Sequence, residues 1–209
     1  MGHFTLAELL LPLIKAAAAN STTAPRIVTV TSAAAVAFIP ANYALPFTSP
    51  TFLSASAKTP LVMPFRLASP IFARDIMRYS LAKLANIMVN VELQRRLDAE
   101  GFNIVCISVN PGAVKTEGGV GVWAGPMKHI MKRVMISEDE GSWNSLFAAT
   151  AKDVEANPAQ YRGKYLEAVG KVAPVPILER NEAQIGALWE VTKDEVNNHL
   201  AKLGLDALA

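Results

Sequence analysis

The chain has 209 residues, of which 51% are hydrophobic and 18% are charged. This composition is typical of a globular protein, and the length suffices for one hydrophobic core, so we expect a single domain. The 20 basic and 18 acidic side chains leave a formal net charge of +2, and the sequence shows no cluster of Lys and Arg interleaved with aromatic residues. Nucleic-acid binding therefore has no support.

The cysteine and the histidines indicate no redox or metal site. The single cysteine, Cys106, lies within the apolar run Ile104–Ile107, where a small buried hydrophobe is expected rather than a nucleophile. His3, His129 and His199 are scattered without metal-ligand spacing, so we expect each to have a surface or packing role.

An apolar helix is predicted near the start of the chain. Thr5 and Glu8 fit a capping box that opens a helix running to about Ala19, with a kink expected at Pro12. Because the helix is apolar on more than one face, we expect it to be buried against a sheet and a partner helix. The run Leu6–Ile14 is too short to span a bilayer and follows no basic segment, so we expect a cytoplasmic protein without a membrane partner.

The first predicted strand ends in a candidate functional residue. The segment Arg26–Ser32 is rich in β-branched residues, which indicates a buried parallel strand. Chemistry in open α/β sheets takes place at the carboxyl ends of the strands. The hydroxyl of Ser32 is therefore placed to hydrogen-bond a substrate oxygen.

Residues 36–70 form an insert with too many prolines for a long helix. Its prolines are Pro40, Pro46, Pro50, Pro60, Pro64 and Pro70, and its charged residues are Lys58 and Arg66. Two interpretations stay open, an apolar flap over a lipophilic substrate and a surface loop without a function of its own.

A long helix follows and carries a Tyr-x-x-x-Lys pair. Ser69–Pro70 provides its N-cap and first-turn proline, and Gly101 ends it after Glu100. Tyr79 and Lys83 lie one turn apart on the same face, where a nearby cation favours a phenolate. Tyr79 is therefore a candidate general acid/base, although two neighbours on an exposed face give the same pattern. The predicted inward stripe is Ile76, Leu84, Ile87, Met88, Val91 and Leu97.

A second buried strand, Ile104–Val109, is ended sharply by Pro111 and Gly112. Taken alone, this motif is an ordinary strand-ending turn. The glycines of Gly118–Gly121 suggest a phosphate loop, but the segment does not join a strand directly to a helix, so we predict a flexible substrate loop.

The C-terminal part is predicted to be mainly helical. The basic residues of 128–133 near two methionines indicate a short amphipathic helix with a solvated charged face. Ser137–Glu140 is a second capping box that opens a further helix. Tyr165–Val169 is predicted to be the last strand, and Asn181–Leu200 the final helix.

The order of these motifs resembles the short-chain dehydrogenase/reductase family. A serine ends a strand, Tyr79 to Lys83 follow on the next long helix, and Asn110–Thr116 reads Asn-Pro-Gly-x-Val-x-Thr after the next strand. Further matches resemble its retinol-dehydrogenase-like branch: Gly2–Phe4, Leu9–Leu13, Ser80–Asn86, Gly163–Tyr165 and Leu188–Glu190. The resemblance covers nearly the whole chain.

The resemblance implies an oxidoreductase that uses NAD or NADP to interconvert a small lipophilic alcohol and a carbonyl. By this resemblance Tyr79 would transfer the proton, and Ser32 would bind the substrate oxygen. Lys83 would lower the pKa of the Tyr79 hydroxyl and hold the nicotinamide ribose. The implied cofactor-binding residues are Tyr79, Lys83, Pro111, Gly112, Val114 and Thr116. Backbone amides near Gly112 would be free to approach the nicotinamide.

Two features of the family are missing from this sequence, the Gly-rich turn that holds the pyrophosphate and an Asn-Asn-Ala-Gly stretch. The fourth catalytic residue of the family, an asparagine, would fall just before Met1. The expected fold is therefore α/β, the C-terminal portion of a doubly wound, Rossmann-like parallel sheet, with residues 1–209 as one truncated domain. The strand that ends at Ser32 would then present an open edge.

The resemblance also implies a homodimer, formed through the first helix and the helix that carries Tyr79. A second copy, the proline-rich insert or a separate N-terminal piece could cover the open edge. The alternative function is a non-catalytic, truncated paralogue that acts as a dimerisation or interaction module.

Overall fold

The computed structural model describes residues 1–40, 42–53 and 76–208. The predicted helix start at Ser69–Pro70 and most of the proline-rich insert lie outside these residues. The first part of the insert includes a short 3-10 turn, η1 (Pro50–Leu53).

The described residues form one sheet with the strand order β1-β2-β3-β4. The strands β1 (Arg26–Val30), β2 (Val105–Val109) and β3 (Lys164–Ala168) are parallel, and β4 (Lys171–Ala173) pairs with β3 in the antiparallel direction. The three parallel strands confirm the predicted strands and their order. The prediction that β3 is the last strand is wrong, because Gly170 adopts φ +72° and turns the chain back into β4.

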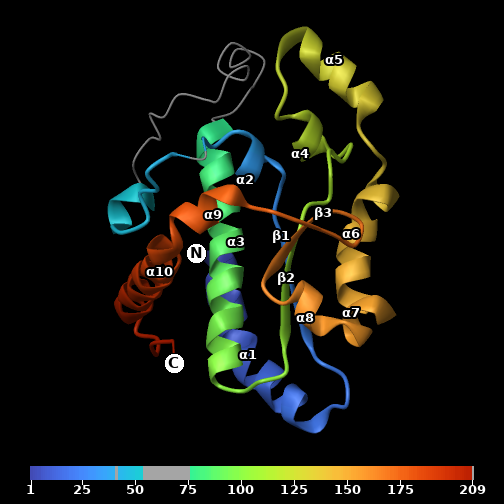
Figure 1. Cartoon of the computed structure of the whole chain (residues 1–209). Helices are drawn as coiled ribbons and strands as arrows, with labels where there is room; N and C mark the ends of the chain where they lie inside the picture. Colours follow the sequence, from blue (N-terminus) through green and yellow to red (C-terminus); the bar gives the residue numbers. More distant parts are fainter. Residues whose placement is uncertain (41, 54–75, 209) are drawn as a thin grey trace.

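Helices cover both faces of the sheet (Figure 1). They are α1 (Gly2–Asn20), α2 (Ala34–Ala37), α3 (Ile76–Ala99), α4 (Glu117–Val120), α5 (Gly125–Val134), α6 (Glu138–Thr150), α7 (Lys152–Ala156), α8 (Pro158–Tyr161), α9 (Pro176–Arg180) and α10 (Glu182–Lys202). One hydrophobic core packs α3 and α10 against one face of the sheet. A second core packs α6, α7 and α8 against the opposite face. This layering is the predicted doubly wound α/β fold.

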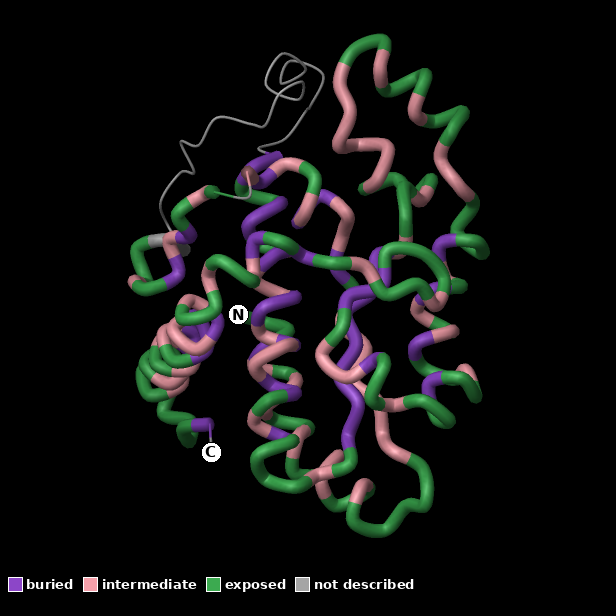
Figure 2. The backbone as a smooth tube through the Cα atoms, viewed as in Figure 1, coloured by how far each residue is buried: buried purple, intermediate pink, exposed green. Residues whose placement is uncertain are grey.

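The strands β1 and β2 differ in burial (Figure 2). Every residue of β2 is buried, because strands flank it on both sides and helices cover both of its faces. In β1 the first four residues are half-buried and Val30 is 44% exposed. The prediction of a fully buried strand is wrong here, since β1 has no described strand on its outer edge.

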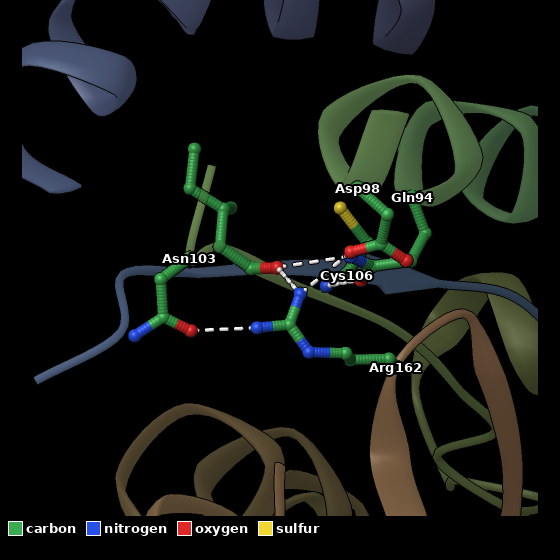
Figure 3. A network of polar contacts seen from close by, with 6 residues as sticks. Gln94, Asp98, Asn103, Cys106 and Arg162 are labelled. Atoms are coloured by element: carbon green, nitrogen blue, oxygen red, sulfur yellow. Dashed lines mark hydrogen bonds and ion pairs between the residues drawn. The ribbon is translucent and has the colours of Figure 1, made fainter. Parts of the chain in front are cut away.

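A polar network ties the end of α3 to the beginning of β2 (Figure 3). Arg162 donates to Asp98 at 2.7 Å and to Asn103 at 2.6 Å. Gln94 donates to Asp98 at 2.9 Å and accepts from the backbone amide of Cys106 at 2.7 Å. These contacts lie at the amino end of the parallel strands, so they support the sheet at the end opposite to Ser32.

The long helix α3 ends within one residue of its predicted end. It finishes at Ala99, and Gly101 adopts φ +79°, a left-handed conformation that favours glycine after a helix. Of the predicted inward stripe, all residues are buried except Val91, which is half-buried. The second capping box is also confirmed, because Ser137 and Glu140 bond each other's backbone amides at the start of α6.

The first helix differs from its prediction in both start and burial. It begins at Gly2, so Thr5 lies inside it and its hydroxyl bonds the carbonyl of Met1 instead of forming a capping box with Glu8. Phe4 is the only buried residue of α1, so within this chain the helix is much less buried against the sheet than predicted, and its burial against a partner helix stays a prediction. The exposed leucines are Leu6, Leu9, Leu10 and Leu13.

By length and composition, α1 is also apolar enough to cross a membrane, with a mean hydropathy of 1.2 over 18 residues. A single such helix near the N-terminus is weak evidence, since core helices and signal sequences share these properties.

Candidate active site

The helix α3 presents Tyr79 and Lys83 on one face, as the four-residue spacing predicts. The ammonium of Lys83 lies 5.8 Å from the centroid of the Tyr79 ring. Tyr79 is 40% exposed, and its hydroxyl makes no hydrogen bond with a described residue. The phenol is therefore accessible to a ligand and has a cation beside it.

Lys83 joins this face to the carboxyl end of β1. Its ammonium donates to the carbonyl of Val30 at 3.4 Å, and its own carbonyl accepts from the hydroxyl of Thr31 at 2.7 Å. Partial burial lowers the pKa of the Lys83 ammonium below its ordinary value. These two contacts hold the end of β1 against the turn of α3 that carries the Tyr-Lys pair.

Ser32 follows directly after this anchored strand end. Its oxygen accepts a hydrogen bond from the backbone amide of Ala34 at 3.2 Å, at the start of α2. No described residue accepts its hydroxyl proton, so this proton can be donated to a ligand oxygen. The side chain is half-buried at the edge of the sheet where chemistry was predicted.

The carboxyl end of β2 lies beside that of β1. The amide of Thr31 donates to the carbonyl of Val109 at 2.8 Å. Ser32 and Asn110, the next residues of the two strands, therefore follow this bond at the same edge of the sheet. Asn144, on α6, donates to the carbonyls of Asn110 at 2.8 Å and Leu166 at 3.1 Å and thereby fixes the ends of β2 and β3. Sequence analysis missed Asn144, for which the one signal was a polar residue on the inward face of α6.

The turn after β2 has the predicted glycine geometry, but its amides are not free. Gly112 adopts φ +83°, and its amide donates to the side-chain oxygen of Asn110 at 3.1 Å. The amide of Val114 donates to the carbonyl of Gly112, and that of Thr116 to the carbonyl of Val114. The prediction of free amides is therefore wrong for these three residues, because an amide without a partner is costly and the turn satisfies its own donors.

The other candidate residues of this segment serve the local structure. Val114 forms a parallel bridge with Ile136, and Pro111 is half-buried. Thr116 is the N-cap of α4 and accepts from the amide of Gly119 at 3.0 Å. The predicted flexible loop at Gly118–Gly121 is instead mostly this short helix, because the threonine cap stabilises its first turn.

A cavity of about 480 Å³ lies between α1, α3, α10 and β1. Lys83 lines it, whereas Tyr79 and Ser32 do not. Its walls are mostly apolar, and the buried Asn90 bonds the hydroxyl of Thr29 at 3.1 Å. Sequence analysis missed this cavity, since its walls come from elements far apart in the chain.

The described residues contain no group of three or more His, Cys, Asp or Glu side chains that could hold a metal ion. Cys106 is fully buried, and burial raises the pKa of its thiol to about 12. The predicted role of Cys106 as a buried hydrophobe is therefore confirmed.

Comparison with known proteins gives relatives of one kind, although no family model matches the chain. The short chain dehydrogenase/reductase dpchH of Colletotrichum higginsianum is 34% identical over 192 residues, which cover 92% of this chain and 46% of that protein. Polyprenol dehydrogenase of Homo sapiens is 29% identical over 164 residues, which cover 77% of this chain and 43% of that protein. The chain thus spans about half the length of these curated relatives.

Among solved structures, an uncharacterised protein from Mycobacterium paratuberculosis matches with a TM-score of 0.52 and 21% identity, over 92% of this chain and 55% of that one. This match shows the fold alone. Together with the ordered motifs and the curated relatives, it leads to one conclusion: the chain belongs to the short-chain dehydrogenase/reductase family.

Proposed function

We propose that this chain forms the catalytic part of a nicotinamide-dependent oxidoreductase that interconverts an alcohol and a carbonyl. The observation that carries the proposal is the Lys83 ammonium beside the ring of Tyr79, held against the strand end that leads to Ser32. Lys83 thus contacts both Tyr79 and the strand end that precedes Ser32, which supports an active site at the carboxyl edge of the sheet.

Each side chain has a distinct role in the proposed reaction. The Tyr79 oxygen takes the hydroxyl proton of the alcohol during oxidation and returns a proton to the carbonyl oxygen during reduction. Lys83 places its positive charge beside the Tyr79 ring and offers hydrogen bonds to the ribose of the nicotinamide. Ser32 donates a hydrogen bond to the same substrate oxygen and so orients it toward Tyr79. A bound nicotinamide would supply or accept the hydride at the substrate carbon.

The residues present fit the nicotinamide end of such a cofactor. The ammonium of Lys83 has a single long bond, to Val30, among the described residues, so further donors remain for ribose hydroxyls. Thr116 uses its oxygen to cap α4 and can still donate its hydroxyl proton to a carboxamide or phosphate oxygen. NAD and NADP share this end of the molecule, and both suit these donors.

The described residues contain no comparable site for the pyrophosphate end of the cofactor. A pyrophosphate site in this kind of fold uses a glycine-rich turn from a strand into the N-terminus of a long helix. The helices that follow β1 and β2 here, α2 and α4, have four residues each. We therefore expect weak cofactor binding, dominated by the nicotinamide end.

A lipophilic substrate is part of the proposal. One of the relatives described above carries the name polyprenol dehydrogenase, and a polyprenol is an apolar alcohol. The loop that follows α2 also adds the buried side chains Ile39, Leu45 and Phe47 near the start of α3. An apolar alcohol of this class is therefore the first substrate to test.

The test is a titration of the purified chain with NADH and NADPH, followed by nicotinamide fluorescence. We expect saturable binding that Lys83→Ala weakens at least about tenfold, since a charged hydrogen bond is worth about 1.5–3 kcal/mol. Tyr79→Phe should keep this binding and lower turnover of an apolar alcohol by roughly 10²–10⁴-fold, the usual contribution of a general acid/base.

Lys152→Ala is the matched control for lost charge, because Lys152 is exposed on α7 and lies outside the candidate site. Equal binding by wild type, Lys83→Ala and Lys152→Ala would contradict the proposed role of Lys83. Absence of binding at millimolar cofactor, by protein whose circular dichroism shows it folded, would contradict the enzymatic function.

That last result would favour the alternative, a non-catalytic interaction module. The observation in its favour is the leucine stripe of α1, which we define as Leu6, Leu9, Leu10 and Leu13. These residues are spaced i, i+3, i+4 and i+7 and therefore lie on one helix face. Each is between 43% and 69% exposed, so the face is available for a partner or a second copy.

A further inference from the structure

The helix α5 (Gly125–Val134) extends beyond the two helical layers and has little cover from the rest of the described chain. It lies above the sheet at its carboxyl edge, at the top of the molecule (Figure 1). None of its residues is buried, and Figure 2 shows exposed and half-buried segments along its whole length. An apolar face on a surface helix normally packs against the core, so such a face on a helix without buried residues indicates a partner outside the chain.

That apolar face is well defined. Met127, Ile130, Met131 and Val134 follow the spacing i, i+3, i+4, i+7 and lie on one side of α5. Ile130 is 52% exposed and Val134 is 65% exposed, whereas the two methionines are half-buried. The open side of this face therefore carries Ile130 and Val134.

The opposite face carries three basic residues around His129. Lys128, Lys132 and Arg133 are exposed, and α5 contains no acidic residue. None of the three forms an ion pair with a carboxylate of the described residues, whereas Lys15, Arg95, Arg96 and Arg162 all do.

Acidic residues are close in sequence but are used elsewhere. Glu138, Asp139 and Glu140 occupy the first turn of α6, where negative charge is stabilised by the helix N-terminus. Glu140 is also bonded to the amide and hydroxyl of Ser137. The charges of α5 are thus not neutralised by this neighbouring acidic turn.

We propose that α5 docks on an anionic membrane surface. A short helix with cations on one face and exposed aliphatic side chains on the other is suited to lie in the plane of a lipid interface. Ile130 and Val134 would enter the boundary between headgroups and acyl chains, while Lys128, Lys132 and Arg133 would face acidic headgroups. The cytoplasmic leaflet of cell membranes has the required negative charge.

This inference departs from the expectation of no membrane partner. That expectation rested on the run Leu6–Ile14 being too short to span a bilayer, whereas α5 would lie on the surface without crossing it. The inference stands apart from the proposed enzymatic function, since it rests on α5 alone. It does agree with a lipophilic substrate, because α5 sits above the edge of the sheet that carries Ser32.

The experiment is co-sedimentation of the full chain with vesicles of phosphatidylcholine and with vesicles of an equimolar mixture of phosphatidylcholine and phosphatidylserine. We expect binding to the anionic vesicles at low salt and its loss at high salt, where surface charges are screened. The double variant Lys128→Ala/Lys132→Ala should lower the partition coefficient roughly 25-fold, about fivefold for each charge. Ile130→Ser/Val134→Ser should lower it roughly tenfold or more.

The matched control is Lys152→Ala/Lys171→Ala, which removes two exposed charges from α7 and β4 and should leave binding unchanged. All of these substitutions are at exposed positions, so melting curves should coincide with wild type. Equal binding to both kinds of vesicle, or binding that the α5 variants do not alter, would overturn the proposal. A fall in mass by light scattering in Ile130→Ser/Val134→Ser would instead assign this face to a second copy and would also overturn it.

Discussion

Cys106 shows at the scale of one residue how burial controls reactivity. Its side chain is fully buried at the centre of the sheet, and its amide is bonded to Gln94. Burial raises the pKa of the thiol from its ordinary value of 9.0 to about 12, and the negative charge of Asp98 adds to this effect. The thiolate that reagents and metals require is therefore suppressed in the folded chain.

This raised pKa predicts a loss of stability in alkaline solution. The folded state holds the thiol proton more tightly than the unfolded state, so the contribution is fully present below pH 9 and is lost as the pH rises toward 12. At about pH 10 the loss should be about 1.4 kcal/mol, equivalent to one unit of pKa. Urea unfolding of wild type and Cys106→Ala at neutral and alkaline pH measures it.

The difference between these two proteins isolates the thiol, because other titrating groups are common to both. Cys106→Ala should lose less stability than wild type between the two pH values. An identical loss in both would show that the thiol is accessible to solvent in the folded state.

At the scale of the element, close packing of α6 against the turn after β2 depends on a glycine. Gly141 is buried in the first part of α6. A Cβ atom at this position would lie 2.4 Å from a methyl carbon of Val114, closer than side chains tolerate. The segment with the candidate cofactor residues therefore reaches its place only because position 141 has no side chain.

Gly141→Ala should accordingly destabilise the chain by about 1–3 kcal/mol, the usual cost of overpacking. Gly186→Ala in α10 is the matched control, since a Cβ atom there would meet nothing within 4 Å. That control should instead stabilise by about 0.5–1 kcal/mol through the higher helix propensity of alanine. Thermal or urea unfolding compares the two, and equal effects would show that Val114 moves aside without cost.

At the scale of the whole molecule, two further apolar surfaces besides the face of α5 are left without cover by the described residues. One is the leucine stripe of α1, and the other is the outer edge of β1, where Val30 is 44% exposed. A sheet edge and an apolar stripe of this kind both favour association. We propose a homodimer that covers the leucine stripe.

The variant Leu6→Ser/Leu13→Ser should shift the chain from dimer to monomer in size-exclusion chromatography with light scattering, because it removes two apolar anchors from the stripe. Ala19→Ser is the matched control at an exposed position on the other side of the same helix. A wild-type chain that is monomeric at all concentrations would contradict the proposal, and so would a double variant that stays dimeric.

The sequence by itself determined the elements and the Tyr-Lys pair. Strands and helices follow from periodicity and caps within a few residues, so β2, the end of α3 at Gly101 and the capping box at Ser137 were predictable. Tyr79 and Lys83 share a face because four residues make about one helical turn.

Only the tertiary structure decided which hydrogen-bond partners these residues have and how far each element is buried. The amide of Gly112 is bonded to Asn110, Thr116 caps α4, and β1 and α1 are left exposed. Each of these outcomes depends on where another segment comes to lie, and a hydrogen-bond donor or an apolar face has no local signal for that. The cavity beside Lys83 has the same origin, because its walls meet only when α1, α3, α10 and β1 pack together.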